Sequence, residues 1–446
     1  MTKGNSLKLI LRFAIPLFIG TLFQQAYNMI DTMIAGYNIG DEAIAAIGAT
    51  SSLYAVIVYF ATGLNSGYGT IISRLFGAKD IGRLKNATAT MVTLSLGITI
   101  LLTGVSLPLL HPLLKLLDTP AEIYQMTYQY IFVILAGMAA AIAYNMCAAF
   151  LQALGNSNIP LYFLIVSCII NLSLDCLFIA GFHMGVVGAG FATIIAESIS
   201  ALSCMIYIFK KYREYLPGKK DWKLDKTLTF EMFTTGTSMG LMLSVFSLGS
   251  IILQKAINNL GTQIITAHTA SRRIYEVFAI PLSTAATATA TFVGQNFGAR
   301  KYERIDNALK KIILAALLWS AVSIVIAIFA GEFMVRLLID TNDPVIIENA
   351  LLNLRLSTAF FFPLGVLIIM RNAMQSMGYK VTPVLSSAIE LLVKVLATFF
   401  VVPRLGYTGV AFTEPIIWVL CAIFIVVVYL TGRKSPLTFP SSIRMI

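Results

Sequence analysis

The sequence predicts an all-α membrane protein with about twelve transmembrane helices, arranged as two pseudo-symmetric lobes of six helices each. Three observations support this prediction: an apolar composition, long apolar segments and an internal repeat. Of the 446 residues, 58% are hydrophobic and only 12% are charged, whereas an average soluble domain is about 45–50% apolar and about 25% charged. The polar residues are too few to cover a soluble core, so we expect lipid to surround most of the chain.

The apolar segments are long enough to cross a bilayer as helices, because about 20 mostly apolar residues span its hydrocarbon layer. They lack the alternation that is typical of strands in a lipid-facing barrel. Charged residues and clusters of Gly, Pro and Asn separate twelve predicted spans: 9–36, 46–73, 87–110, 124–149, 159–181, 187–209, 228–256, 263–297, 308–330, 346–372, 381–402 and 407–431.

Positive charge gathers in alternate loops of this prediction. The loops on the other side hold little beyond Lys115, Lys255, Arg336 and Arg404. The positive-inside rule assigns the basic loops to the cytoplasm, and with them both termini. The net charge of +11 then indicates a membrane surface rather than nucleic acid. The predicted organisation is an N-terminal lobe over 1–210, a cytoplasmic linker over 211–226 and a C-terminal lobe over 227–446.

An internal repeat supports the two lobes. One constant offset in residue number, here called the short offset, aligns "FGAKDIGRLKNA" from Phe76 with "FGARKYERIDNA" from Phe297. It also pairs Gly40 with Gly261, Tyr54 with Tyr275 and Gly185 with Gly406, while a slightly larger one, the long offset, pairs Gly155 with Gly378 and Pro160 with Pro383. Each half has an even number of spans, so both insert the same way up. Parallel repeats of this kind are typical of transporters that work by alternating access.

Ionisable residues inside predicted spans are costly, and they are functional candidates by default. Asp31 lies two helical turns after Gln24, and Asp175 lies one turn after Asn171, so each acid shares a helix face with an amide. Thr193 follows in the next span. Carboxylate, amide and hydroxyl oxygens suit a hard cation such as Na⁺, and a desolvated carboxylate can also hold a proton. Interhelical hydrogen bonding is the structural alternative for both acids.

Other charges inside the spans leave two interpretations open. Glu390 and Lys394 are one turn apart, so a structural salt bridge is as plausible as a functional role. Arg272 and Arg273 can pair with Glu276, which favours a structural set. Glu197 either binds a cationic substrate or ends near the membrane interface.

Two residues near helix bends or ends complete the set of candidates. Pro16 precedes Asp31 by fifteen residues in the same predicted helix and permits a kink there. Such a bend could respond to the charge state of the acid. Glu414 lies close to a predicted helix end, where we expect it to be solvated.

Motifs for catalysis are missing from the sequence. It contains no HExxH, Walker or GxSxG pattern, and the five cysteines lie in apolar segments, which argues against a disulfide framework. We therefore expect no enzyme, no nucleotide and no cofactor other than a coupling ion. Energy for active transport would come from an ion gradient.

The chain resembles the MATE (multidrug and toxic compound extrusion) transporters of the prokaryotic, DinF-like type, over essentially its whole length. The resemblance is strongest in "AIPLFIGTLFQQAYNMIDTMIAGYNIGDEAIAAIG", "GLNSGYGTIISRLFGAKD", "LQALGNSNIPLYFLIVSCIINLSLDCLFI" and "FVGQNFGAR". It implies two six-helix lobes in a V shape in the inner (plasma) membrane. It also implies export of organic cations and other xenobiotics in exchange for Na⁺ or H⁺.

The resemblance also implies site residues. It assigns a cation site to Asp31, Asn171, Asp175 and Thr193, with Gln24, Asn145 and Tyr128 as neighbours. The NorM-like branch of the family has acids in its seventh and tenth helices. This chain instead has Gln254 and Lys255 near the end of its seventh span and no acid in the centre of its tenth. The resemblance therefore leaves a cation site in the second lobe open.

Three alternatives remain at this point. A major facilitator also has twelve helices in parallel halves, and "FGAKDIGRLKNA" faintly resembles its basic loop. A flippase for lipid-linked precursors, of the same superfamily, could use Arg272 with Arg273 for a pyrophosphate, although such proteins usually have about fourteen helices. A membrane enzyme or receptor is disfavoured by the missing motifs and by the duplication.

Overall fold

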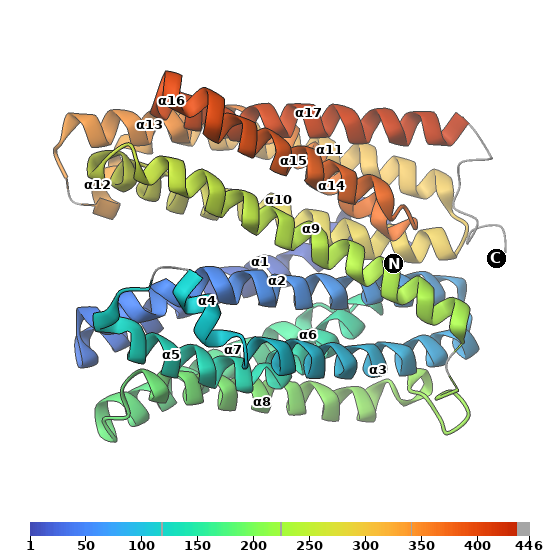
Figure 1. The fold of residues 1–446 in the computed structure, drawn as a ribbon. Coiled ribbons are helices and arrows are strands. Elements are labelled where there is room, and N and C mark those ends of the chain that lie inside the picture. Colours follow the sequence, from blue (N-terminus) through green and yellow to red (C-terminus); the bar gives the residue numbers. More distant parts are fainter. Residues whose placement is uncertain (117–118, 224, 340, 435–446) are drawn as a thin grey trace. The chain divides into compact units, whose positions relative to one another are not determined.

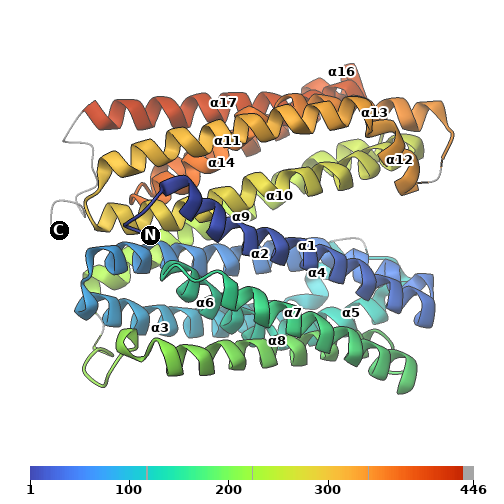
Figure 2. The same cartoon turned by 180° about the vertical axis from the view of Figure 1, so that it is seen from behind.

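The computed structural model describes residues 1–116, 119–223, 225–339 and 341–434, and every regular element in these ranges is a helix (Figures 1 and 2). The α-helices are α1 Ser6–Ile39, α2 Asp41–Ala78, α3 Ile81–Ser106, α4 Leu110–Leu116, α5 Ala121–Ala136, α6 Met138–Ala153, α7 Asn158–Asp175, α8 Gly185–Lys211, α9 Lys226–Asn258, α10 Thr262–Gly298, α11 Tyr302–Phe329, α12 Gly331–Ile339, α13 Pro344–Ala359, α14 Phe361–Ser376, α15 Val381–Leu396, α16 Val402–Leu405 and α17 Tyr407–Lys434. Two π-helices, η1 Cys176–Gly181 and η3 Ala397–Val401, and the short 3₁₀ helix η2 Arg213–Tyr215 complete the described elements.

The number of membrane spans agrees with the prediction. Ten described helices or helix runs are long and apolar enough to cross a bilayer, and twelve result when each of two bent helix pairs counts as one span. The pairs are α5 with α6, bent by 45°, and α13 with α14, bent by 51°. The prediction of an all-helical membrane protein with about twelve spans is confirmed.

The two bends have local causes. Gly137 separates α5 from α6, and a Cβ atom added there would overlap the Ile194 side chain of α8. The break therefore occurs where a neighbouring helix leaves no room for a side chain. At the second bend, Pro363 lies in the first turn of α14, where its ring would clash with the carbonyl four residues earlier if α13 continued.

The chain forms two compact units. One comprises residues 15–240, and the other comprises residues 1–14 with 241–446, of which 435–446 lie outside the described part. The predicted lobes, 1–210 and 227–446, differ from these units in residues 1–14, in the linker and in the first half of α9. The lobe division itself stays a prediction.

The first half of α9 packs closely on α2 within the 15–240 unit. A Cβ atom added at Gly63 would lie 2.6 Å from the Gly240 backbone, and one at Gly67 would lie 2.6 Å from the Gly236 backbone. Such contacts need glycine, because any side chain would separate the two helices. Nearby, Arg74 Nη2 lies 2.8 Å from Glu231 Oε1. The glycine pairs and this ion pair explain why the unit ends inside α9.

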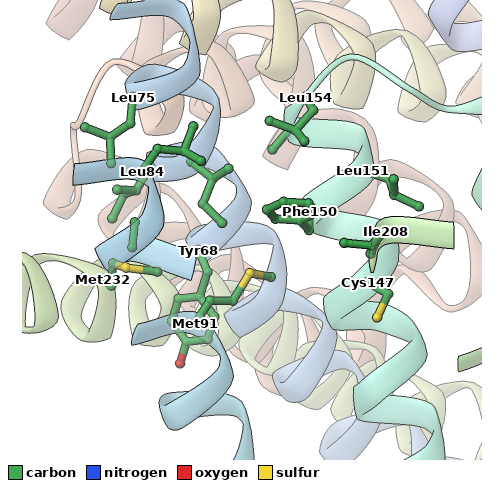
Figure 3. Packing of buried hydrophobic residues seen from close by; sticks show 14 of the residues in the cluster. Tyr68, Leu75, Leu84, Met91, Cys147, Phe150, Leu151, Leu154, Ile208 and Met232 are labelled. Atoms are coloured by element: carbon green, nitrogen blue, oxygen red, sulfur yellow. The ribbon is translucent and has the colours of Figure 1, made fainter. Parts of the chain in front are cut away.

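The core of the 15–240 unit is an apolar cluster of α2, α3 and α6, with contributions from α8 and α9 (Figure 3). Figure 3 shows Tyr68 and Leu75 of α2 near Leu84 and Met91 of α3, with Phe150 reaching toward them from α6. The tight packing of these helices gives the functional side chains nearby a rigid support.

The sequence repeat is present in the element boundaries. The starts of α2, α3 and α4 precede those of α10, α11 and α12 by the short offset, and the starts of α5, α6 and α7 precede those of α13, α14 and α15 by the long offset. A π-helix follows α7 and another follows α15. The residues with positive φ also pair: Gly40 with Gly261, Lys79 with Arg300, Gly155 with Gly378, and Gly185 with Gly406. The two halves therefore repeat one backbone pattern.

Candidate functional site

The predicted cation-site residues come from three helices of the 15–240 unit. Asp31 lies on α1, Asn171 and Asp175 lie near the end of α7, and Thr193 lies on α8. Helices α7 and α8 pack against each other. Asp175 is the last residue of α7, where the π-helix η1 begins. π-Helical turns are frequent at functional sites, because they alter the direction of side chains.

Hydrogen bonds join these residues. The Asn171 amide nitrogen donates to Thr193 Oγ1 at 3.3 Å, and Thr193 Oγ1 donates to the Ala189 carbonyl at 3.0 Å. Asp31 and Asp175 are buried, at 8% and 0% exposure. Their carboxyl groups are close enough to interact electrostatically with each other. The structure therefore brings together four residues from three helices that are far apart in the sequence.

The oxygen atoms of the cluster lack donors. In the described part of the chain, Asp31 Oδ1, Asn171 Oδ1 and both carboxylate oxygens of Asp175 are buried without a hydrogen-bond partner. Two buried carboxylates at this distance repel each other unless a proton or a cation lies between them. The atoms available are all hard oxygen acceptors, which suit Na⁺ or a proton.

The cluster differs from a transition-metal centre. Among the described residues, no group of three or more His, Cys, Asp and Glu side chains is arranged to hold a metal ion. The cluster has two carboxylates, and its remaining oxygens come from a neutral amide and a hydroxyl. This donor set fits a monovalent cation or a shared proton.

Other predicted residues lie around the cluster or apart from it. Glu197 is half-buried one turn after Thr193 and interacts electrostatically with Tyr54, Tyr130 and Tyr144. Gln24 is exposed on α1, Asn145 is half-buried on α6, and Pro16 is buried in α1, next to the boundary between the compact units.

Tyr128 belongs to a separate aromatic stack. Its ring centroid lies 4.3 Å from that of His111 and 5.9 Å from that of Phe132. Tyr130, two residues later on α5, instead interacts electrostatically with the acids Asp31, Asp175 and Glu197. No signal in the sequence distinguishes these two tyrosines.

Tyr27 is a site residue that the sequence analysis missed. Its hydroxyl interacts with that of Thr193, and it interacts electrostatically with Asp31, Asp175 and Glu197. Tyr27 precedes Asp31 by one helical turn on α1. The spacing rule that selected Asn171 beside Asp175 would therefore have found it.

A second buried charged cluster lies in the other unit. Lys394 is fully buried, and its Nζ lies 3.3 Å from Glu390 Oε1 and 3.0 Å from Glu414 Oε1. Arg371 Nη2 lies 3.5 Å from Glu390 Oε2 and donates to Ser386 Oγ at 2.7 Å. The one-turn spacing of Glu390 and Lys394 thus produces an ion pair, although its role stays open.

Two further residues of this unit can be compared with their predictions. The expectation that Glu414 is solvated is wrong. Its side chain is only 28% exposed, because the buried ammonium of Lys394 needs a second counter-charge. Arg272 pairs with Glu276 at 3.1 Å, in agreement with the structural pairing that the sequence favoured.

Comparison with known proteins finds a family model and several relatives that match most of the chain. The MatE family model matches residues 16–177 and 238–400. The probable multidrug resistance protein YpnP of Bacillus subtilis is 27% identical over 380 residues, which is 84% of each chain. The multidrug export protein MepA of Staphylococcus aureus is 24% identical over 429 residues, covering 96% of this chain and 94% of MepA.

Solved structures share the fold. A multidrug resistance MATE family transporter in an outward-facing conformation has a TM-score of 0.88 at 24% identity, with 97% of this chain and 96% of that chain covered. The Vibrio cholerae MATE transporter VcmN has a TM-score of 0.85 at 21% identity, with coverages of 97% and 98%. Because the family model matches most of the sequence in both halves, the chain belongs to the MatE family of multidrug efflux transporters.

Proposed function

We propose that the protein is a secondary active antiporter that exports organic cations and other xenobiotics in exchange for Na⁺ or H⁺. The observation that supports the coupling is the pair of buried carboxyl groups, Asp31 and Asp175, with their donor-free oxygens. The names of the relatives, multidrug resistance and multidrug export proteins, support the substrate class. The site would bind the coupling ion through Asp31, Asp175, Asn171 and Thr193.

The proposed coupling follows from charge repulsion. Without an ion, two buried carboxylates destabilise the arrangement that holds α1 against α7. An ion or proton between them removes this cost, so its binding favours one conformation of the helices over another. Pro16 leaves the Arg12 carbonyl without its helical donor, which makes α1 a helix that can bend in response. Alternating access would result from this difference in stability.

The substrate would bind by similar chemistry. Glu197 interacts electrostatically with Tyr54 of α2, Tyr130 of α5 and Tyr144 of α6, and a carboxylate in the same region as aromatic rings suits an organic cation. We expect the protein to lie in the plasma membrane with both termini in the cytoplasm, because the positive-inside rule assigns the basic loops to that side. The proposal involves membrane lipid as solvent and no nucleic acid, nucleotide or further cofactor.

Transport by purified protein in vesicles tests the proposal. Efflux of a fluorescent lipophilic cation would be measured under an imposed Na⁺ gradient and then under an imposed pH gradient. Wild type would be compared with Asp31→Asn and with Glu122→Gln, which removes an exposed acid at the start of α5. We expect one gradient to drive efflux in wild type and in Glu122→Gln, and neither to do so in Asp31→Asn.

The opposite results are also informative. Full gradient-driven efflux in Asp31→Asn would end the coupling role of that acid. Absence of efflux in wild type under both gradients would contradict export of organic cations. The search would then turn to anionic substrates, beginning with lipid-linked precursors.

A further inference from the structure

The internal repeat relates the two buried clusters to each other. The starts of α7 and α15 are related by the long offset, and the turns before them match in conformation at Gly155 and Gly378. In this register Asn171 corresponds to Lys394. Gly185 and Gly406 come later in the two halves and also match in conformation. They align α8 with α17 by the short offset.

The second register makes Glu414 the counterpart of Thr193, and the contacts of the counterparts match. In the first half, Asn171 Nδ2 lies 3.3 Å from Thr193 Oγ1. In the second half, Lys394 Nζ lies 3.0 Å from Glu414 Oε1. Both contacts join equivalent helices, α7 with α8 and α15 with α17. The charged cluster of the second half therefore stands where the candidate cation site stands in the first half.

The charges at the two places differ. The short offset relates Asp31 to Ile252. Asp175 corresponds to Thr398 by the long offset, or to Leu396 by its place directly before the π-helix, so both acids of the first half are replaced by uncharged residues. The second half has acids at other positions, Glu390 and Glu414, and it also has a fully buried lysine. Its carboxylates thus meet a positive charge that belongs to the chain.

We propose that Glu390 and Glu414 form a monovalent-cation site whose permanent occupant is the ammonium group of Lys394. The ammonium contacts one carboxylate on α15 and another on α17, and it lies 4.5 Å from the centre of the Phe246 ring on α9. Two carboxylates and an aromatic face are the groups that recognise an alkylammonium ion.

Helix α9 is shaped around the stem of this lysine. A Cβ atom added at Gly249 would lie 2.8 Å from Lys394 Cδ and 3.5 Å from Leu391 Cδ1. The methylene stem therefore passes over a glycine, one turn along α9 from Phe246. The site accommodates the whole aminobutyl group and not only its charge.

Neighbouring polar atoms show that the cluster has further binding capacity. Arg371 Nε and Gln375 Oε1 are buried without hydrogen-bond partners among the described residues, and they lie one turn apart on α14. Other titratable groups also face the cluster. Tyr275 on α10 and Cys421 on α17 interact electrostatically with both Glu390 and Glu414, and His268 on α10 interacts with Glu414 and Arg272. The unpaired donor of Arg371, whose guanidinium also contacts Glu390, is expected of a binding site rather than of a closed salt bridge.

The proposal has a consequence for transport, which rests on the proposed function of the first half. A tethered ammonium cannot leave, so the second half exchanges no coupling ion. The protein would then bind about one coupling ion per chain, at Asp31 and Asp175. The resemblance to the family had left open whether the second lobe has its own cation site.

The test removes the lysine side chain that holds the ammonium in place, and it supplies a free cation instead. Lys394→Ala would be made in an Asp31→Asn background, so that the candidate site of the first half does not contribute. The probes are n-propylammonium, which has the three carbons and the nitrogen that Lys394→Ala removes, and ²²Na⁺. The matched control is Lys255→Ala in the same background, because Lys255 is an exposed lysine at the end of α9.

We expect n-propylammonium to raise the thermal unfolding midpoint of the Lys394→Ala protein, because a ligand that binds only the folded state stabilises it. We expect bound ²²Na⁺ to rise to about one ion per chain. Neither change should occur in the Lys255→Ala control, and adding Glu390→Gln should remove both. A Lys394→Ala protein that responds to neither cation would overturn the proposal.

Folding of the variants also decides the question. If Lys394→Ala folds only when n-propylammonium is present, the site needs an occupant, as proposed. The pair Glu390→Gln with Lys394→Met removes both charges, so it should fold without added cation and should not respond to one. If neither protein folds under any condition, Lys394 serves packing alone and the proposal is wrong. None of these measurements uses transport, so failure of the antiport proposal would not affect them.

Discussion

The cluster around Asp175 and the cluster around Lys394 occupy equivalent places in two repeated halves, but their charges are arranged differently. The first has two acids within reach of each other and neutral partners, so a proton or cation from outside must compensate them. The second contains two acids, a lysine and an arginine, and they compensate one another. A common backbone thus supports one cluster suited to ion exchange and one suited to permanent pairing.

Transfer of the lysine to the first half should have the largest effect. Asn171→Lys places an ammonium at the position equivalent to Lys394, within reach of Asp31 and Asp175. We expect it to lower binding of the coupling ion, and with it gradient-driven efflux, by about tenfold or more, because an opposite charge already neutralises the acids. The measurement is ion binding and vesicle efflux beside Asn171→Met, which tests the loss of the amide alone. Equal activity of the two variants would contradict the proposed equivalence.

A smaller change in the same cluster should have a partial effect. Asp175→Asn keeps the shape of the side chain and removes one of two negative charges, so Asp31 still attracts the ion. We expect efflux to fall by a few-fold and to need a higher concentration of the coupling ion. The concentration dependence of efflux measures this shift. An unchanged dependence would remove Asp175 from the site.

The two acids of the second cluster, Glu390 and Glu414, differ in exposure and should differ in their contribution to stability. Glu390→Gln leaves Lys394 and Arg371 without a buried counter-charge, which should lower the free energy of unfolding by about 3 kcal/mol. Glu414 is 28% exposed, so Glu414→Gln should cost about 1 kcal/mol. Denaturation of both variants in mixed micelles gives the comparison. Equal losses would show that the two acids share the lysine evenly.

The smallest expected effect is that of Tyr27→Phe. The change removes the hydroxyl that interacts with Thr193 and leaves the ring in place. A typical hydrogen bond contributes about 1 kcal/mol, which corresponds to about fivefold in ion affinity. Titration of ion binding would detect this change. A variant with wild-type affinity would limit the site to the four residues predicted from the sequence.

The membrane helices could be predicted from the sequence, because a chain in lipid must satisfy its backbone hydrogen bonds within each segment. It could not predict the bend at Gly137, which depends on Ile194, a residue of a helix two spans later. Both acids of the first cluster were recognised as buried charges. Their proximity was not derivable from spacing, since α1 and α7 are distant in the sequence, with five other helices between them.

Two further features could not be predicted, for the same physical reason. The expected solvation of Glu414 considered its distance from a helix end and not its partner on another helix. Tyr128 and Tyr130 are two residues apart on α5 and have similar sequence surroundings, yet only Tyr130 interacts with the acids. Periodicity identifies which residues share a face of one helix. It does not identify which neighbour that face meets.

The two π-helices bear on how the duplicated chain evolved. Each follows the helix that carries a cluster, η1 after α7 and η3 after α15. A π-turn represents one extra residue in a helix, and independent insertion at matching places in both halves is a poor explanation. The ancestral half-length chain therefore already had this turn before it was duplicated, whereas the acids and the lysine diverged afterwards. New ion selectivity can then evolve in this architecture through replacement of a few side chains, with no change in the path of the backbone.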